Sequence, residues 1–139
     1  MTENITIRPG YTEPLAEHEL TSKIIGAAIH VHKELGPGFV ESVYHNALCI
    51  TLAKRGIKFE KECEVPVIFE DVEVGVHRLD LLVEDRVIVE LKAIKRLEPV
   101  HFAIVRSYLK AMDLDHGLIL NFSKPVLEVK RAMRELVKR

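Results

Sequence analysis

Asp80, Glu90 and Lys92 are charged residues set into an otherwise apolar stretch, residues 79–92. Burying such charges is costly unless they are paired, lie at an edge, or bind something such as a cation. Mg²⁺ in proteins is commonly held by one or two carboxylates together with waters and substrate phosphate. A pair of acids with a nearby lysine therefore suits the binding of a divalent cation. The alternative is a cross-strand ion pair, with Glu90 and Lys92 as solvated neighbours.

The same stretch is predicted to form the two strands of a β-hairpin, because it alternates along most of its length and has a polar break at residues 84–86. In the second strand, Ile88, Glu90 and Lys92 share one face. Folding back across the tight connection brings Asp80 roughly opposite Glu90. The sequence alone does not fix the strand register to a single residue. The hairpin would thus collect both acids and the lysine at one end of an apolar sheet.

The composition is that of a globular protein. The chain has 139 residues, of which 47% are hydrophobic and 29% charged, which fits one domain with a core and excludes a disordered chain. The net charge of −1 provides no global positive field for a polyanion. Any nucleic-acid site must therefore be local.

Cys49 and Cys63 form no Cys-x-x-Cys pair and are too few for a disulfide framework, so a reducing compartment fits. The N-terminus has no apolar signal region, and no apolar run approaches the roughly 20 residues of a membrane helix. A cytoplasmic location without membrane contact is expected.

Two helices are predicted before the first strand, over about residues 14–35 and 40–55, from the helical spacing of their apolar residues. In the second helix, Glu41 lies three residues before Tyr44, so it points toward the core side. A Glu in a first helical turn is also favoured by the helix dipole and can cap free N–H groups. Glu41 therefore has two interpretations, a capping residue or a site residue.

Strands dominate the middle of the chain. Residues 57–70 alternate early between apolar and charged, and Pro66 within them predicts an edge position or a bulge. Residues 72–83 lead into the hairpin. A third helix is predicted from Pro99 to Met112, and the apolar run 117–122 is typical of a strand buried on both faces.

The two ends of the chain complete the expected organisation. Residues 1–13 show no sustained period and are predicted to be a flexible arm, so that the domain spans residues 14–139. The tail, residues 126–139, is helical in period and basic. A helix between the third strand and the last strand predicts a parallel crossover in an otherwise antiparallel sheet.

The residues that carry the chemistry follow one another as Gly38-x-x-Glu41-x-x-Tyr44, Asp80, and Glu90-x-Lys92. With their surrounding segments they resemble the GxxExxY family, a branch of the PD-(D/E)xK nuclease-like superfamily, over about residues 20–123. The resemblance implies an α/β fold with a restriction-endonuclease-like mixed sheet of about four strands flanked by helices. Gly38 and Tyr44 would be structural positions of the motif.

The same resemblance implies a metal-dependent catalytic site. Asp80 and Glu90 would be metal-binding carboxylates, and Glu41 would be a further acid donated by the helix. Lys92 would orient or activate the attacking water. These four residues would complete a site for one or two Mg²⁺ or Mn²⁺ ions.

The implied activity is hydrolysis of phosphodiester bonds in DNA or RNA. Cations that follow the hairpin could contact backbone phosphates and give local affinity; they are Lys95, Arg96, Arg106 and Lys110. His101 has two interpretations, a substrate contact or a polar residue in the first turn of its helix. Small nucleases of this architecture often form homodimers to address two strands.

The third helix departs from the family pattern. It usually reads His-Glu-Ala-Gln in this family, whereas here Phe102 and Ile104 replace the polar pair after His101. The alternative function is therefore a catalytically weak or inactive protein that binds nucleic acid or a protein partner. A purely structural oligomerisation domain is a third interpretation.

Overall fold

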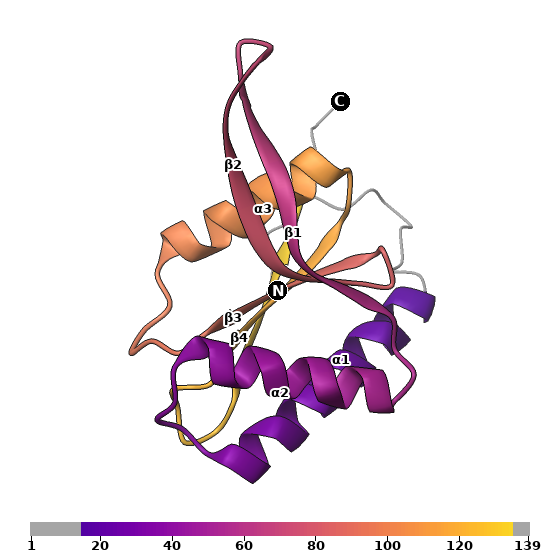
Figure 1. Ribbon diagram of the computed structural model, residues 1–139, viewed down its shortest axis with the longest axis vertical. Helices are drawn as coiled ribbons and strands as arrows, with labels where there is room; N and C mark the ends of the chain where they lie inside the picture. The colour runs from indigo at the N-terminus through magenta and orange to yellow at the C-terminus, as the bar shows by residue number, and fades with distance from the viewer. Residues whose placement is uncertain (1–14, 135–139) are drawn as a thin grey trace, which may run out of the picture.

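A five-stranded mixed sheet organises the computed structural model, which describes residues 15–134 (Figure 1). In chain order the elements are α1 (Leu15–Leu35), α2 (Glu41–Lys54), β1 (Phe59–Phe69), β2 (Val72–Val83), β3 (Val87–Lys92), α3 (Pro99–Met112), β4 (His116–Asn121) and β5 (Glu128–Met133). This architecture confirms the predicted mixed sheet flanked by helices, with five strands in place of about four.

The strands lie in the order β1-β2-β3-β4-β5, and only β3 and β4 are parallel among them. This confirms the predicted crossover, in which α3 connects β3 to β4. Every residue of β4 is buried, as expected for a short apolar strand covered on both faces.

The helices cover both faces of the sheet, with α1 and α2 on one side and α3 on the other (Figure 1). Alternation along β3 divides the core accordingly. Val87, Val89 and Leu91 pack in the cluster that contains residues of α1 and α2, whereas Ile88 packs with residues of α3. Glu90 has the same parity as Ile88, so β3 directs it toward the α3 side.

The tail corrects one prediction. The sequence predicts a helix over residues 126–139, whereas Glu128–Met133 forms β5, paired antiparallel with β4; residues 135–139 lie outside the described part of the chain. The backbone groups along the outer edge of β4 need partners, and β5 supplies them while burying Ala132 to 2% exposure. The expected N-terminal arm, residues 1–13, lies outside the described residues.

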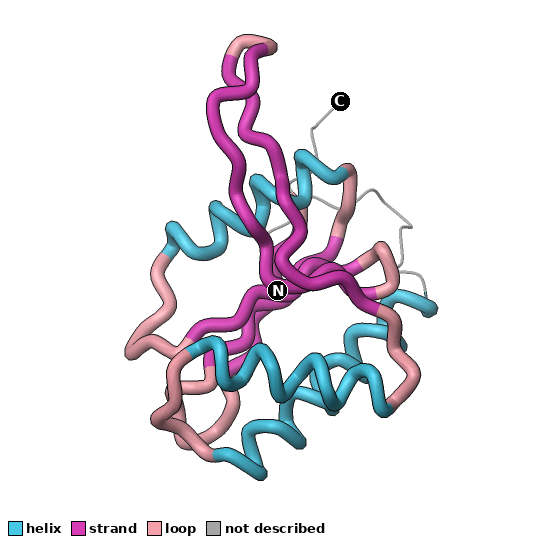
Figure 2. The backbone as a smooth tube through the Cα atoms, in the orientation of Figure 1, coloured by secondary structure: helices cyan, strands magenta, loops and turns pink. Residues whose placement is uncertain are grey.

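The β1–β2 hairpin projects from the body of the molecule (Figures 1 and 2). β1 is an edge strand and its register with β2 shifts between Val67 and Ile68, which confirms the edge position and the bulge predicted from Pro66. Glu70 and Asp71 at the tip both have positive φ, 50° and 66°, as a tight two-residue hairpin connection requires.

No helix within residues 15–134 is long and apolar enough to cross a membrane. Cys49 and Cys63 are both free.

Candidate active site

Asp80 and Glu90 meet where β2 and β3 part. The ladder between these strands runs from Val83↔Val87 to Leu81↔Val89, so continuing it places Asp80 opposite Glu90, as predicted. Beyond this point the two carboxylates, and not backbone carbonyl groups, accept the hydrogen bonds that join the strands. Glu90 Oε1 accepts a hydrogen bond from the Asp80 N–H at 2.8 Å, and Asp80 Oδ2 accepts one from the Leu91 N–H at 2.8 Å.

Burial raises the pKa of both carboxyl groups. For Asp80, desolvation is the largest cause and outweighs the opposing hydrogen bond from Leu91. Glu90 is only 7% exposed, and desolvation followed by the negative charge of Asp80 raises its pKa to about 7. Lys92 lowers both pKa values without cancelling these effects. Two acids held this way favour a bound proton or a bound cation.

The raised pKa of Glu90 predicts how stability depends on pH without added metal. The folded chain binds this proton more tightly than the unfolded chain, whose Glu has a pKa near 4.5. The stabilisation from this proton is therefore fully present below about pH 4.5. It is lost as pH rises through about 7, and the total loss is about 3 kcal/mol. Urea unfolding in EDTA from pH 5 to pH 8 should show the free energy of wild type falling relative to that of Glu90→Gln. Parallel curves for the two proteins would contradict the shift.

Glu41 lies at the start of α2 but does not cap it. The residue before it, Val40, is the N-cap, and no side-chain hydrogen bond caps this helix. Glu41 Oε2 instead accepts a hydrogen bond from the N–H of Ala93 at 3.3 Å, directly after β3. Its charge raises the pKa of both Asp80 and Glu90, which places Glu41 beside the site.

The rest of the motif explains how Glu41 reaches this position. The hydroxyl of Tyr44 donates to the Gly36 carbonyl at 2.6 Å and accepts from the Phe39 N–H at 3.1 Å. Its ring stacks on Phe122 with a centroid distance of 4.5 Å. Gly38 has φ of 114°, which L side chains rarely adopt. Gly38 lets the loop turn and Tyr44 ties it to the core, so that α2 begins facing the end of β3.

Lys92 ends β3 on the same face as Glu90. Within residues 15–134 no ion pair joins it to Asp80 or Glu90, so the predicted alternative of a cross-strand ion pair is absent there. The chain that follows is held by Asn121, which is fully buried and bonds both the N–H and the carbonyl of Ile94, at 3.1 and 2.9 Å. Lys92 thus ends a well-fixed strand, and its ammonium forms no ion pair with the described residues.

Three site neighbours were not predicted. His45, one turn after Glu41 on α2, lies with Nε2 at 3.2 Å from the Asp80 carbonyl oxygen, to which a ring N–H can donate. Tyr108 on α3 has its pKa raised to about 12 by burial and by the charges of Glu90 and Asp80. Its hydroxyl lies 3.5 Å from Nδ1 of His77. The i+4 spacing of His45 from Glu41 was a usable signal, whereas Tyr108 and His77 required the fold.

The predicted phosphate contacts lie at the surface around α3. Four cations there are exposed: Lys95, Arg96, Arg106 and Lys110. His101 accepts a hydrogen bond from the Glu98 N–H on Nδ1 at 2.8 Å and completes a capping box with Glu98. This supports the interpretation of His101 as a first-turn residue.

Phe102 and Ile104, which replace the polar pair, are partly buried against the α3 side of the core. Their contacts are those of packing residues. Residues 15–134 also contain no group of three or more His, Cys, Asp or Glu side chains arranged to hold a metal ion. Of the three predicted metal ligands, the fold therefore brings the carboxylates of Asp80 and Glu90 together, and Glu41 lies beside them.

Comparison with known proteins identifies a superfamily and a structure with a similar fold. A family model described as the PD-(D/E)XK nuclease superfamily matches residues 18–132. No curated protein matches the chain. A solved structure, "Crystal structure of SSO0001", superposes with a TM-score of 0.53 at 16% sequence identity, over 69% of this chain and 50% of that one. The chain thus spans about half the length of a protein with which it shares the fold.

Proposed function

The chain belongs to the PD-(D/E)XK nuclease superfamily, and from this premise we propose that it is a metal-dependent nuclease that hydrolyses phosphodiester bonds in DNA or RNA. One observation carries the proposal: the buried carboxylate of Glu90 and the partly buried carboxylate of Asp80 face each other where two strands part, with Lys92 on the strand of Glu90.

The donor set fits a hard divalent cation. Each carboxylate uses one oxygen to accept a backbone N–H, which leaves Asp80 Oδ1 and Glu90 Oε2 without a hydrogen bond from the described residues. Mg²⁺ is commonly bound by one or two carboxylates, with waters completing its shell. Asp80 and Glu90 would hold Mg²⁺ or Mn²⁺ in this way, and the chemistry supplied there is a water of lowered pKa and compensation of phosphate charge.

The surrounding residues have separate tasks. Lys92 would place its ammonium next to the attacking water and the scissile phosphate, where negative charge develops. Glu41 would accept a hydrogen bond from a water in the site through the oxygen that Ala93 does not use. His45 would fix the backbone of Asp80, and Tyr108 would cover the α3 side of the carboxylates.

Exposed cations would hold the nucleic-acid backbone. Replacing both Lys95 and Arg96 by Gln should weaken binding of labelled single- and double-stranded DNA and RNA in EDTA. The slope of log affinity against log salt should become shallower by about 2, because two phosphate contacts are lost. Fluorescence anisotropy over a salt series measures both quantities. The matched control replaces Lys23 and Lys33, which are exposed on α1, and an equal effect there would contradict a local site.

A second candidate is a nuclease fold that binds nucleic acid without turnover. Two observations favour it: the packing of Phe102 and Ile104 into the core, and the lack of a preassembled three-residue ligand group within residues 15–134. Salt-sensitive binding to nucleic acid, without cleavage at any metal concentration, is its signature.

The test of function is a cleavage assay on wild type with Mg²⁺, Mn²⁺ or EDTA, using labelled single- and double-stranded DNA and RNA. Cleavage that requires the metal supports the nuclease and identifies its substrate. Metal binding by calorimetry with retained nucleic-acid binding but no cleavage supports the second candidate. A folded protein that binds neither metal nor nucleic acid would overturn both.

A further inference from the structure

The outer part of the β1–β2 hairpin exposes apolar side chains that the fold does not use. This distal arm, residues 66–76, lies beyond the body of the molecule (Figures 1 and 2). Its large apolar residues are between 37% and 61% exposed; they are Val67, Ile68, Phe69, Val72, Val74 and Val76. A two-stranded ribbon is at best marginally stable in water by itself, and contiguous exposed apolar surface marks interaction sites.

The charge of the distal arm selects the kind of partner. Residues 66–76 contain Glu70, Asp71 and Glu73 and no Lys or Arg. None of these three acids forms an ion pair with the described residues. An acidic tip repels phosphate, so nucleic acid does not suit it. The distal arm instead suits a partner whose surface is apolar and bordered by cations.

The mode of contact follows from the strands. Pro66 lacks an N–H and lies on the open edge of β1, which discourages addition of a further strand there. Phe69 and Val72 are direct cross-strand partners, so their side chains lie on one face and can enter a pocket together.

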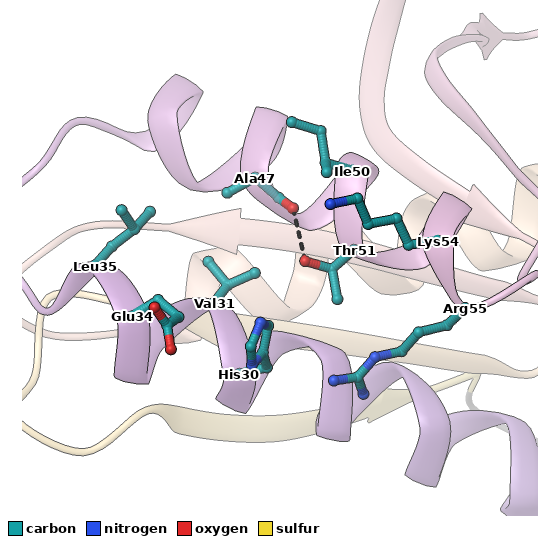
Figure 3. Close-up of a pocket in the computed structure, with 9 residues that line it drawn as sticks. All are labelled: His30, Val31, Glu34, Leu35, Ala47, Ile50, Thr51, Lys54 and Arg55. Atoms are coloured by element: carbon teal, nitrogen blue, oxygen red, sulfur yellow. Dashed lines mark hydrogen bonds between the residues drawn. The ribbon is translucent and has the colours of Figure 1, made fainter.

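A pocket of about 300 Å³ between α1 and α2 has the matching properties (Figure 3). Its lining residues are His30, Val31, Glu34, Leu35, Ala47, Ile50, Thr51, Lys54 and Arg55. Val31, Leu35, Ala47 and Ile50 make it largely apolar. Ile50 is 57% exposed, so it offers apolar surface that a partner can cover.

The border of this pocket is basic on the α2 side. Lys54 and Arg55 are exposed, and neither is ion-paired within residues 15–134. Arg55 extends to α1, where Nη1 lies 3.8 Å from the position of a Cβ on Gly26. Lys54 and Arg55 thus stand beside the apolar surface, and no described residue neutralises either charge through an ion pair.

We propose that the distal arm of one copy docks into the α1–α2 pocket of a second copy, with Phe69 and Val72 entering it and Glu70 and Asp71 facing Lys54 and Arg55. The arm lies at one end of the long axis and α1 and α2 at the other (Figure 1). Two antiparallel copies can therefore make the contact twice and close a two-fold dimer. The proposal does not depend on the nuclease activity.

The test is the mass of the full chain in solution, measured by sedimentation velocity over a concentration series. Wild type is expected to dimerise. Phe69→Glu in the arm and Ile50→Glu in the pocket should each weaken the dimer by about tenfold or more, as loss of a central contact does. The matched control is Val126→Glu, at an apolar residue 78% exposed outside both surfaces, which should leave the dimer intact.

Exchanging the charges of the two surfaces distinguishes a lost contact from a misfolded variant. Lys54→Glu with Arg55→Glu should dissociate the dimer, and adding Glu70→Lys with Asp71→Lys in the same chain should restore it. Circular dichroism checks that each variant is folded. A wild type that stays monomeric, which would assign the arm to another protein, overturns the proposal. A dimer that is unaffected by Phe69→Glu and by Ile50→Glu would also overturn the proposal. So would a charge exchange that fails to restore the dimer.

Discussion

Replacing Glu90 by Gln is expected to abolish metal-dependent cleavage, with a loss of about a thousandfold or more, equivalent to roughly 4 kcal/mol in the barrier. Glu90 is almost fully buried and faces Asp80, so its charge has no partner in the described residues strong enough to keep its pKa low. A bound cation would supply that partner. The amide keeps the shape of the side chain but cannot supply the negative charge.

Calorimetry on the same samples separates the site from a structural role. Mn²⁺ binding should be lost in Glu90→Gln and in Asp80→Asn, while both variants remain folded. Their free energy of unfolding in EDTA near neutral pH should rise, because one buried carboxylate no longer repels the other. Glu19→Gln, at an exposed acid of α1, is the matched control and should change none of these quantities. Unchanged metal binding in both site variants would refute the assignment of the ligands.

Replacing Lys92 by Met is expected to lower the cleavage rate by about a hundredfold to a thousandfold, the scale of losing one charged group next to the developing oxyanion. The methyl thioether keeps much of the length and removes the ammonium. Metal binding should persist, because Asp80 and Glu90 remain. The pKa of Glu90 should rise further, since Lys92 is one of the groups that lower it.

The chain provides its own control for this variant. Glu128-Val129-Lys130 repeats the Glu-x-Lys spacing on β5, where Lys130 is exposed. Lys130→Met should therefore leave cleavage, measured as single-turnover rates at saturating metal, at the wild-type value. Equal losses in the two Lys variants would indicate a general effect of surface charge, and an unaffected Lys92→Met would remove Lys92 from the mechanism.

Two outcomes bear on the altered third helix. Phe102 and Ile104 pack against the core, so restoring polar residues there would cost apolar contacts. A wild type that binds Mn²⁺ but cleaves nothing would indicate that the carboxylate pair is preserved and turnover is not. Robust cleavage would show that these positions are dispensable for the reaction.

Local patterns were enough to predict most of the elements. Alternation and the polar break predicted the hairpin, the spacing of apolar residues predicted α3 from Pro99 to Met112, and the helix between two strands predicted the parallel pair of β3 and β4. The opposition of Asp80 and Glu90 followed from a short connection, because a tight turn leaves few registers. The resemblance of the motifs to a nuclease family needed no fold, and the superfamily is confirmed.

The tertiary structure decided the rest, for reasons that no local pattern contains. Residues 128–133 became β5 because the edge of β4 needed hydrogen-bond partners, although their period also suits a helix. Glu41 lies near the carboxylates because the hydrogen bond from Tyr44 to the Gly36 carbonyl fixes the start of α2 close to Ala93. The parting of β2 and β3 lets each acid accept an N–H of the other strand. The pKa of Glu90 is nevertheless raised, because the packed sheet and α3 bury its carboxyl group. The sequence by itself determined which residues could do the chemistry, and packing determined the electrostatic environment in which they would do it.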